Sequence, residues 1–153
     1  MAFREASLET SAAPGRVWQV WSDVNRWPEW NPDMNESRID GALKLGATGM
    51  INTKSGGKHD VVVTHYEEGR SFELESTALP GTKMAIRATI APSSSGSTIM
   101  QGFEPRGVLA PIVGPLMGGQ ILKTFNAVLN GLKKKVETAG PRYPAREASF
   151  RLT

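Results

Sequence analysis

The spacing of apolar side chains changes along this chain of 153 residues. From the N-terminus to about residue 104, outside residues 11–31, short stretches alternate apolar with polar positions, and glycine, proline or serine separates them. Alternation with a period of two is typical of strands that bury one face. It predicts about seven strands, over residues 2–10, 34–40, 46–54, 58–67, 71–77, 83–91 and 97–104. Short strands with turn signals between them indicate a curved antiparallel sheet.

Two helical patterns interrupt and follow these strands. The apolar residues of VWQVWSDV, at 17–24, recur at the spacing of one helical face, and the prolines at 28 and 32 limit the next segment to a second short helical turn. A long apolar stripe runs from 121 to 136, and Gly140-Pro141 ends that helix. Residues 109–119 are apolar but carry prolines and glycines. We interpret them as the first turns of the same helix, kinked at Pro115 or loosely wound.

This order of elements predicts an α+β fold. A curved antiparallel sheet of six to seven strands wraps around the long C-terminal helix, and two short helices follow the first strand. The length suits one domain, which we assign to residues 1–138. Residues 139–153 are polar and contain proline, so we expect a mobile tail.

Charge and composition exclude several classes of protein. Six of the eighteen Lys and Arg lie at or after Lys133 with two acidic residues among them, so residues 1–132 carry a net charge of −1 (twelve basic against thirteen acidic). A basic body for nucleic-acid binding is therefore not expected. No apolar run approaches the roughly 20 residues of a membrane span. The chain has no cysteine and its N-terminus shows no secretory signal, so a cytoplasmic location is expected.

Few residues suggest chemistry on their own. His59 and His65 share a strand but stand about 20 Å apart, so they cannot hold one metal ion, and no metal site is expected. Glu73 and Glu75 are about 6.7 Å apart on one face of a strand, a separation that a glycosidase could use. The apolar Phe72 beside them points to the opposite face, however, and predicts that both carboxylates face water. Neither a serine nucleophile motif nor a phosphate-binding loop is present.

Four segments, in this order, carry a resemblance to a known family. They are VWQVWSDVNRWPEWNP at 17–32, VVVTHYEEGRSFEL at 61–74, IAPSSSGST at 90–98 and LKTFNAVLNGLKKKVE at 122–137. Over most of residues 3–138 the chain resembles the polyketide cyclase/dehydrase family of the START-like (SRPBCC) superfamily. The resemblance implies the helix-grip fold, with an apolar cavity between the curved sheet and the long helix. A shared fold does not by itself imply an activity.

The leading hypothesis is that a small hydrophobic or amphipathic molecule binds in this cavity. No cofactor is expected, and we expect a monomer or homodimer. We expect the cavity walls to come from the long helix and from inward strand positions. The expected ligand-binding residues are Trp30, Phe72, Leu74, Met84, Ile86, Met100, Phe103, Ile112, Leu116, Ile121 and Phe125. The tryptophans are interpreted first as core residues, and ligand contact by Trp30 or Trp27 at the cavity mouth is the alternative. The pattern leaves open which side of the last strand faces the cavity. Either Met100 and Glu104 point inward, or Gln101 and Phe103 do.

The alternative function is an enzyme of the cyclase or dehydrase type that acts on a polyketide or aromatic substrate in the same cavity. It needs an ionisable group at the base of the cavity to move a proton. Glu104, Arg87 or His65 would supply that group if it faced inward. Charged residues are seldom fully buried, which favours outward positions for Glu104 and Arg87. A protein-docking module is a third hypothesis, and a filled interior would favour it.

Overall fold

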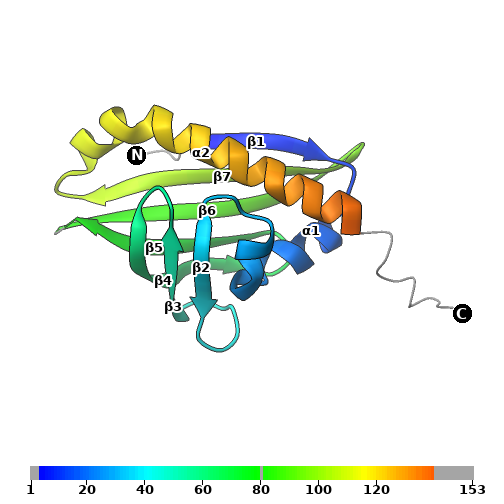
Figure 1. The fold of residues 1–153 in the computed structure, drawn as a ribbon, viewed down its shortest axis with the longest axis horizontal. Coiled ribbons are helices and arrows are strands. Elements are labelled where there is room, and N and C mark those ends of the chain that lie inside the picture. The colour runs from blue at the N-terminus through cyan, green and yellow to red at the C-terminus, as the bar shows by residue number, and fades with distance from the viewer. Residues whose placement is uncertain (1–3, 80, 140–153) are drawn as a thin grey trace, which may run out of the picture.

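The computed structural model describes residues 4–79 and 81–139 of the chain (Figure 1). Its elements in chain order are β1 (Arg4–Thr10), α1 (Pro14–Trp21), the 3-10 helix η1 (Val24–Glu29), β2 (Met34–Ile39), β3 (Thr48–Thr53), β4 (Gly57–Glu67), β5 (Ser71–Leu79), β6 (Thr82–Ser93), β7 (Gly96–Gly107) and α2 (Ala110–Ala139). The predicted tail, 139–153, lies outside the described residues apart from Ala139, the last residue of α2.

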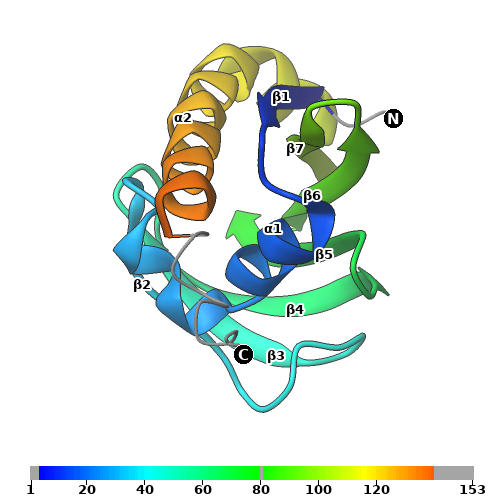
Figure 2. The ribbon, with the colours of Figure 1, turned by 90° about the vertical axis from the view of Figure 1, so that its right-hand side faces the viewer.

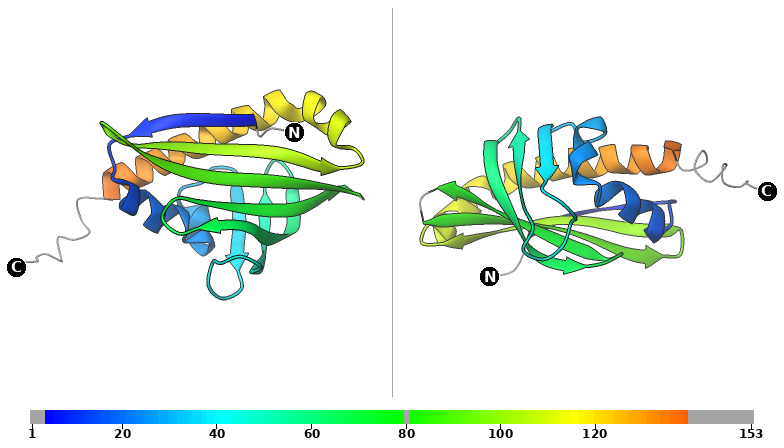
Figure 3. Two further views of the ribbon diagram at one scale, coloured as in Figure 1. Left: turned by 180° about the vertical axis from the view of Figure 1, so that it is seen from behind. Right: turned by 90° about the horizontal axis from the view of Figure 1, so that it is seen from below.

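The strands form one antiparallel sheet of seven strands in the order β1-β7-β6-β5-β4-β3-β2. Figure 2, turned by 90° from Figure 1, shows the sheet curling around α2, with α1 inside the curl. Seen from behind, in the left part of Figure 3, β1, β7 and β6 lie in front of α2. We call the face toward α2 concave and the other face convex. The predicted helix-grip fold is thereby confirmed, with seven strands and two short helices after β1.

The boundaries of the last elements differ from the sequence pattern. β6 and β7 run to Ser93 and Gly107, a few residues beyond the ends predicted from alternation. Gly107 has φ +110°, and a Cβ there would lie 2.2 Å from the backbone oxygen of Gly81, so a glycine is required. α2 begins at Ala110, which confirms that residues 110–119 form the first turns of the long helix, with Pro115 inside it.

α2 is buried mainly through its second half. Its apolar stripe there packs in the core through Phe125, Val128, Leu129, Leu132 and Val136, each at most 6% exposed. Gly131 allows this close approach, because a Cβ at that position would lie 2.2 Å from the backbone oxygen of Trp30. In the first half, by contrast, Ile112, Leu116 and Met117 are exposed. No helix within the described ranges is long and apolar enough to cross a membrane.

The convex face of the sheet holds a buried carboxylate. Glu73 points away from α2, as the alternation of β5 predicts, yet it is only 1% exposed. Arg87 of β6 and Arg106 of β7 reach across neighbouring strands and cover it. The expectation that Glu73 faces water is therefore wrong, because strand parity decides the face of the sheet but not what lies above it.

Candidate functional site

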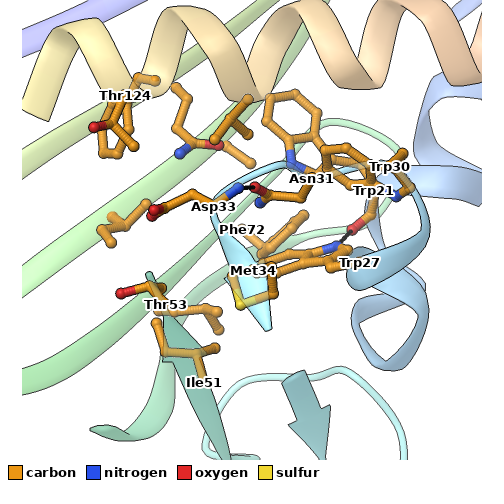
Figure 4. Close-up of a pocket in the computed structure, with 16 residues that line it drawn as sticks. Trp21, Trp27, Trp30, Asn31, Asp33, Met34, Ile51, Thr53, Phe72 and Thr124 are labelled. Atoms are coloured by element: carbon orange, nitrogen blue, oxygen red, sulfur yellow. Dashed lines mark hydrogen bonds between the residues drawn. The ribbon is translucent and has the colours of Figure 1, made fainter. Parts of the chain in front are cut away.

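A cavity lies between α2 and the concave face of the sheet. Its inner part has a volume of about 60 Å³. The walls come from the short helices, the sheet and α2. Figure 4 draws the sixteen lining residues, which are Trp21, Trp27, Trp30, Asn31, Asp33, Met34, Ile51, Thr53, Phe72, Leu74, Ile86, Ala88, Gln101, Thr124, Phe125 and Val128. Most of these side chains are apolar.

A larger outer part continues from the inner one and has a volume of about 310 Å³. The two parts share six lining residues, namely Asp33, Ile51, Thr53, Ile86, Thr124 and Phe125. The outer part extends between residues 117–125 of α2 and the turn that joins β3 to β4, where Ser55, Gly56 and His59 line it. The combined space reaches the lower end of the range for small-molecule sites, about 300–1,000 Å³.

Aromatic side chains form one end of the inner cavity. Trp21 ends α1, and Trp27 and Trp30 lie in and just after η1, so the short helices position all three. Trp27 stacks on Phe72 of β5 at a centroid distance of 6.2 Å, and it meets Trp30 edge to face at 6.3 Å. The Trp27 Nε1–H donates to the backbone oxygen of Trp21 at 2.8 Å, which ties η1 to α1. This end of the cavity is therefore an ordered aromatic wall.

Polar groups are few and lie at defined points of the cavity. Asp33, just before β2, lines both parts, and its carboxylate accepts hydrogen bonds from the backbone N–H and the hydroxyl of Ser55 at 3.0 and 2.8 Å. The buried amide of Gln101 lines the inner part. The Trp30 Nε1–H is buried and has no hydrogen-bond partner within the described chain. Figure 4 shows the tryptophans toward α1 and η1, and Thr53 and Thr124 on the opposite side.

Eight of the expected ligand-binding residues line this cavity. Trp30, Phe72 and Leu74 line the inner part, Met84, Phe103 and Ile121 the outer part, and Ile86 and Phe125 both. The parity of the last strand is settled as well. Gln101 and Phe103 point to the concave face, so Met100 points to the convex face and its expected place in the wall is wrong.

Ile112 and Leu116 are also not among the residues that line this cavity. They are 57% and 77% exposed, and the reason is helical phase. At 100° per residue, Ile112 lies 180° around α2 from Ile121, and Leu116 lies 180° around it from Phe125. Met117 is one turn before Ile121 on the same face, and it lines the outer cavity instead.

The three candidate catalytic residues lie on the wrong face of the sheet for the cavity. Arg87 and His65 are the register partners of Glu73 on the two neighbouring strands, which places them on the convex face with it. Glu104 shares the outward parity of β7 and accepts a hydrogen bond from Arg106 Nε at 2.9 Å. The inward position that catalysis would need is therefore wrong for all three. Cross-strand register, which the sequence does not show, pairs Arg87 and His65 with Glu73, and the parity of β7 turns Glu104 to the same face.

The convex cluster is a network of charges that satisfy one another. Glu73 Oε1 accepts from Arg87 Nη2 at 2.8 Å, and Glu73 Oε2 accepts from Thr64 Oγ1 at 2.6 Å and from Arg106 Nη1 at 2.9 Å. Burial pushes the pKa of Glu73 up, but these hydrogen bonds and the Arg106 charge outweigh it and hold the pKa below its ordinary value of 4.5. Burial pushes the pKa of Arg106 down, but its hydrogen bonds to the carboxylates of Glu73, Glu104 and Glu75 outweigh burial and raise that pKa. Each charge is satisfied within the cluster, so we assign this network to stability.

Apart from Gln101, whose inward position it left open, sequence reasoning missed the polar residues of the cavity. Asp33 follows the Trp-Asn-Pro of the tryptophan segment, and Thr124 directly precedes Phe125 in the helical stripe, but neither stands in a recognisable motif. His59 lines the outer cavity and its ring nitrogen Nε2 lies 2.6 Å from the backbone oxygen of Gly56. Within the described residues, no three His, Asp or Glu side chains come together as a metal ion would require.

Comparison with known proteins agrees with this architecture. Residues 4–137 match the model of the family described as polyketide cyclase/dehydrase and lipid transport. A START superfamily protein from Mycobacterium smegmatis is similar in structure, with TM-score 0.67 and 18% identity over 89% of this chain and 97% of that one. Protein CV1439 from Chromobacterium violaceum gives TM-score 0.62 and 20% identity over 88% and 96% of the two chains.

A third similar structure is a point mutant of norcoclaurine synthase from Thalictrum, in complex with a transition-state analogue. It has TM-score 0.67 and 16% identity over 91% of this chain and 96% of that one. Identities this low establish the fold alone. Among curated protein sequences, none matches this chain. The family match, however, spans nearly the whole described chain, and the protein belongs to the polyketide cyclase/dehydrase and lipid transport family.

Proposed function

We propose that this protein binds a small hydrophobic or amphipathic molecule in the cavity between α2 and the sheet. The observation that carries the proposal is the continuity of the two parts, a mostly apolar inner cavity that opens into an outer one of about 310 Å³. Apolar side chains lining such a space favour an apolar ligand, since its transfer from water is worth roughly 25 cal/mol per Å² buried. An interior of this kind argues against the protein-docking hypothesis, which called for a filled core.

The test is a titration with N-phenyl-1-naphthylamine, a neutral dye that fluoresces when it leaves water. The wild type should bind it saturably. Thr124→Phe places a ring where the two parts meet, because Thr124 lines both, and should weaken binding at least about tenfold. Lys123→Phe adds the same ring to the exposed neighbouring position of α2 and should leave binding unchanged. If the wild type fails to bind, or if Thr124→Phe binds as the wild type does, the cavity is not the site.

A polyketide cyclase or dehydrase type of enzyme is the second candidate, and one observation favours it. Asp33 places a carboxylate in the wall of both parts, within reach of a bound molecule, and Ser55 holds it in position. A carboxylate so placed is a candidate base for the loss of a proton beside a carbonyl group. A poly-β-keto ester incubated with the protein should then cyclise or lose water faster than with Asp33→Asn. Equal rates would leave only binding.

A further inference from the structure

The indole N–H of Trp30 is a buried donor in the wall of the inner cavity, and the described chain supplies no acceptor for it. Trp30 is 8% exposed, and its Nε1 is buried without a hydrogen-bond partner among the described residues. An indole nitrogen can only donate a hydrogen bond. Leaving a buried donor unsatisfied destabilises the fold, and such groups in native proteins call for an explanation.

Trp27 shows that the fold can supply an acceptor for an indole N–H in this wall. It is also 8% exposed and lines the same inner cavity, but its Nε1–H donates to the backbone oxygen of Trp21 at 2.8 Å. Trp30 cannot easily move to find an acceptor. Its backbone N–H donates to the oxygen of Trp27 at 3.1 Å, and its own backbone oxygen packs against Gly131 of α2. The unsatisfied donor is therefore held in place.

The charges around the cavity restrict what an acceptor can be. None of the residues that line its two parts, all of which lie in the described chain, is a lysine or an arginine. The only acidic one is Asp33, which lines both parts. A carboxylate ligand would meet this negative charge in a mostly apolar space without a cation to balance it, and the cost of burying such a charge is high.

We propose that the cavity selects a neutral ligand whose inner end carries a hydrogen-bond acceptor, such as a ketone or quinone oxygen, which accepts from the Trp30 Nε1–H. This inference rests on the proposed function and specifies its ligand. The inner space of about 60 Å³ has room for a polar end group, and the outer 310 Å³ holds an apolar body. The buried Gln101 amide, in the same inner wall, offers such an end group a second polar contact.

Three probes of nearly one shape test the proposal. They are 2-acetylnaphthalene, a neutral ketone, 2-ethylnaphthalene, its hydrocarbon counterpart, and 2-naphthoate, an anion. Equilibrium dialysis gives the dissociation constant of each without relying on tryptophan fluorescence. Trp30→Phe removes the N–H and should weaken ketone binding relative to hydrocarbon binding by about two- to twelvefold, the effect of one hydrogen bond. Trp27→Phe removes the same atoms from the same wall and should leave that ratio as in the wild type.

The anion tests the charge argument separately. The wild type should bind 2-naphthoate more weakly than the ketone. Asp33→Asn should strengthen naphthoate binding relative to ketone binding at least about threefold, as expected for the loss of the repulsion between two charges about 6 Å apart in water. Should naphthoate bind the wild type as well as the ketone does, the selection for neutral ligands would be refuted.

An infrared measurement on the wild type covers the case in which Trp30→Phe does not fold. The carbonyl band of 2-acetylnaphthalene labelled with ¹³C at the ketone should move to lower frequency when bound than it has in hexane. An unshifted band overturns the proposal. An unchanged ketone-to-hydrocarbon ratio in Trp30→Phe does the same, and this is the result expected if a retained water satisfies the N–H. In both cases hydrocarbon binding still supports the proposed function, whereas failure of every probe to bind would overturn both proposals.

Discussion

Replacing Glu73 by glutamine tests whether the convex network stabilises the fold. The substitution keeps the size of the side chain and removes its charge. In the structure, Glu73 is 1% exposed and accepts hydrogen bonds from Thr64, Arg87 and Arg106, which come from three different strands. Glutamine keeps one acceptor oxygen but turns an NH₂ group toward these donors. The fold of Glu73→Gln should remain intact and its free energy of unfolding should fall.

The expected size of that fall depends on burial. Removing one partner of a fully buried ion pair costs about 3–5 kcal/mol, because the other charge is left without compensation. Here the side chains of Arg87 and Arg106 are 33% and 35% exposed, so water screens part of their charge and reduces the cost. We therefore expect a loss of about 2–3 kcal/mol, which lowers the urea midpoint by about 1 M. Glu75→Gln, two residues along β5 and less buried, should cost less than about 1 kcal/mol.

The dependence on pH gives the sharper readout. Since the folded state holds the pKa of Glu73 below its ordinary value of 4.5, the charged form contributes stability above pH 4.5. That contribution is lost as the pH falls through the lower, folded-state pKa. Urea unfolding at several pH values should show a constant difference between wild type and Glu73→Gln from pH 8 to pH 6, and a shrinking one below pH 4.5. A difference that is absent, or that stays constant down to acid unfolding, would refute the role of the charge.

Three further predictions concern the long helix and the chain end. Gly131→Ala should destabilise the protein by about 1–3 kcal/mol in urea unfolding, because its Cβ would lie 2.2 Å from the Trp30 backbone oxygen. Gly119→Ala has open space around it and should stabilise α2 by up to about 1 kcal/mol. Equal effects of the two substitutions would contradict the close packing at Gly131. Amide exchange should be faster over 110–119 than over 121–136, and bound 2-ethylnaphthalene should slow the first stretch most; uniform protection would argue against local opening. Truncation after Gly140 should leave the melting temperature nearly unchanged, and a fall of many degrees would show that the domain extends further.

The sequence predicted the fold because its two periods are nearly undisturbed. Alternation defines which side of each strand is apolar, and the stripe from 121 to 136 defines the buried face of α2. Both patterns are local, and the sheet has only to bring the apolar faces together. The sequence could not predict the partners across the strands. The pairing of Glu73 with Arg87 on one side and His65 on the other, with a bulge between Val63 and His65, depends on register.

The residues of the cavity were predicted as far as apolar burial identifies them. Phe72, Ile86 and Phe125 were found because a buried apolar side chain of the sheet or of α2 also lines the space between them. The inward position of Gln101 was left open with the parity of the last strand, and Asp33 and Thr124 were missed for the opposite reason. A polar residue normally faces water, and only the fold shows that these two face the cavity. The residues that give a site its specificity are thus the least visible in a hydrophobic pattern.

The two halves of α2 are held to the sheet in different ways, and this affects how a ligand would enter. The second half is buried, and Glu137 near its end accepts hydrogen bonds from the hydroxyl of Thr10 at 2.8 Å and the backbone N–H of Ser11 at 3.1 Å. The first half carries exposed apolar residues and contains Pro115, whose missing N–H leaves one helical hydrogen bond unmade. The outer cavity lies beneath residues 117–125, where these halves meet, and the tryptophan wall lies toward the anchored half. Opening of the first half would therefore admit a ligand and leave Trp30 in place to orient it.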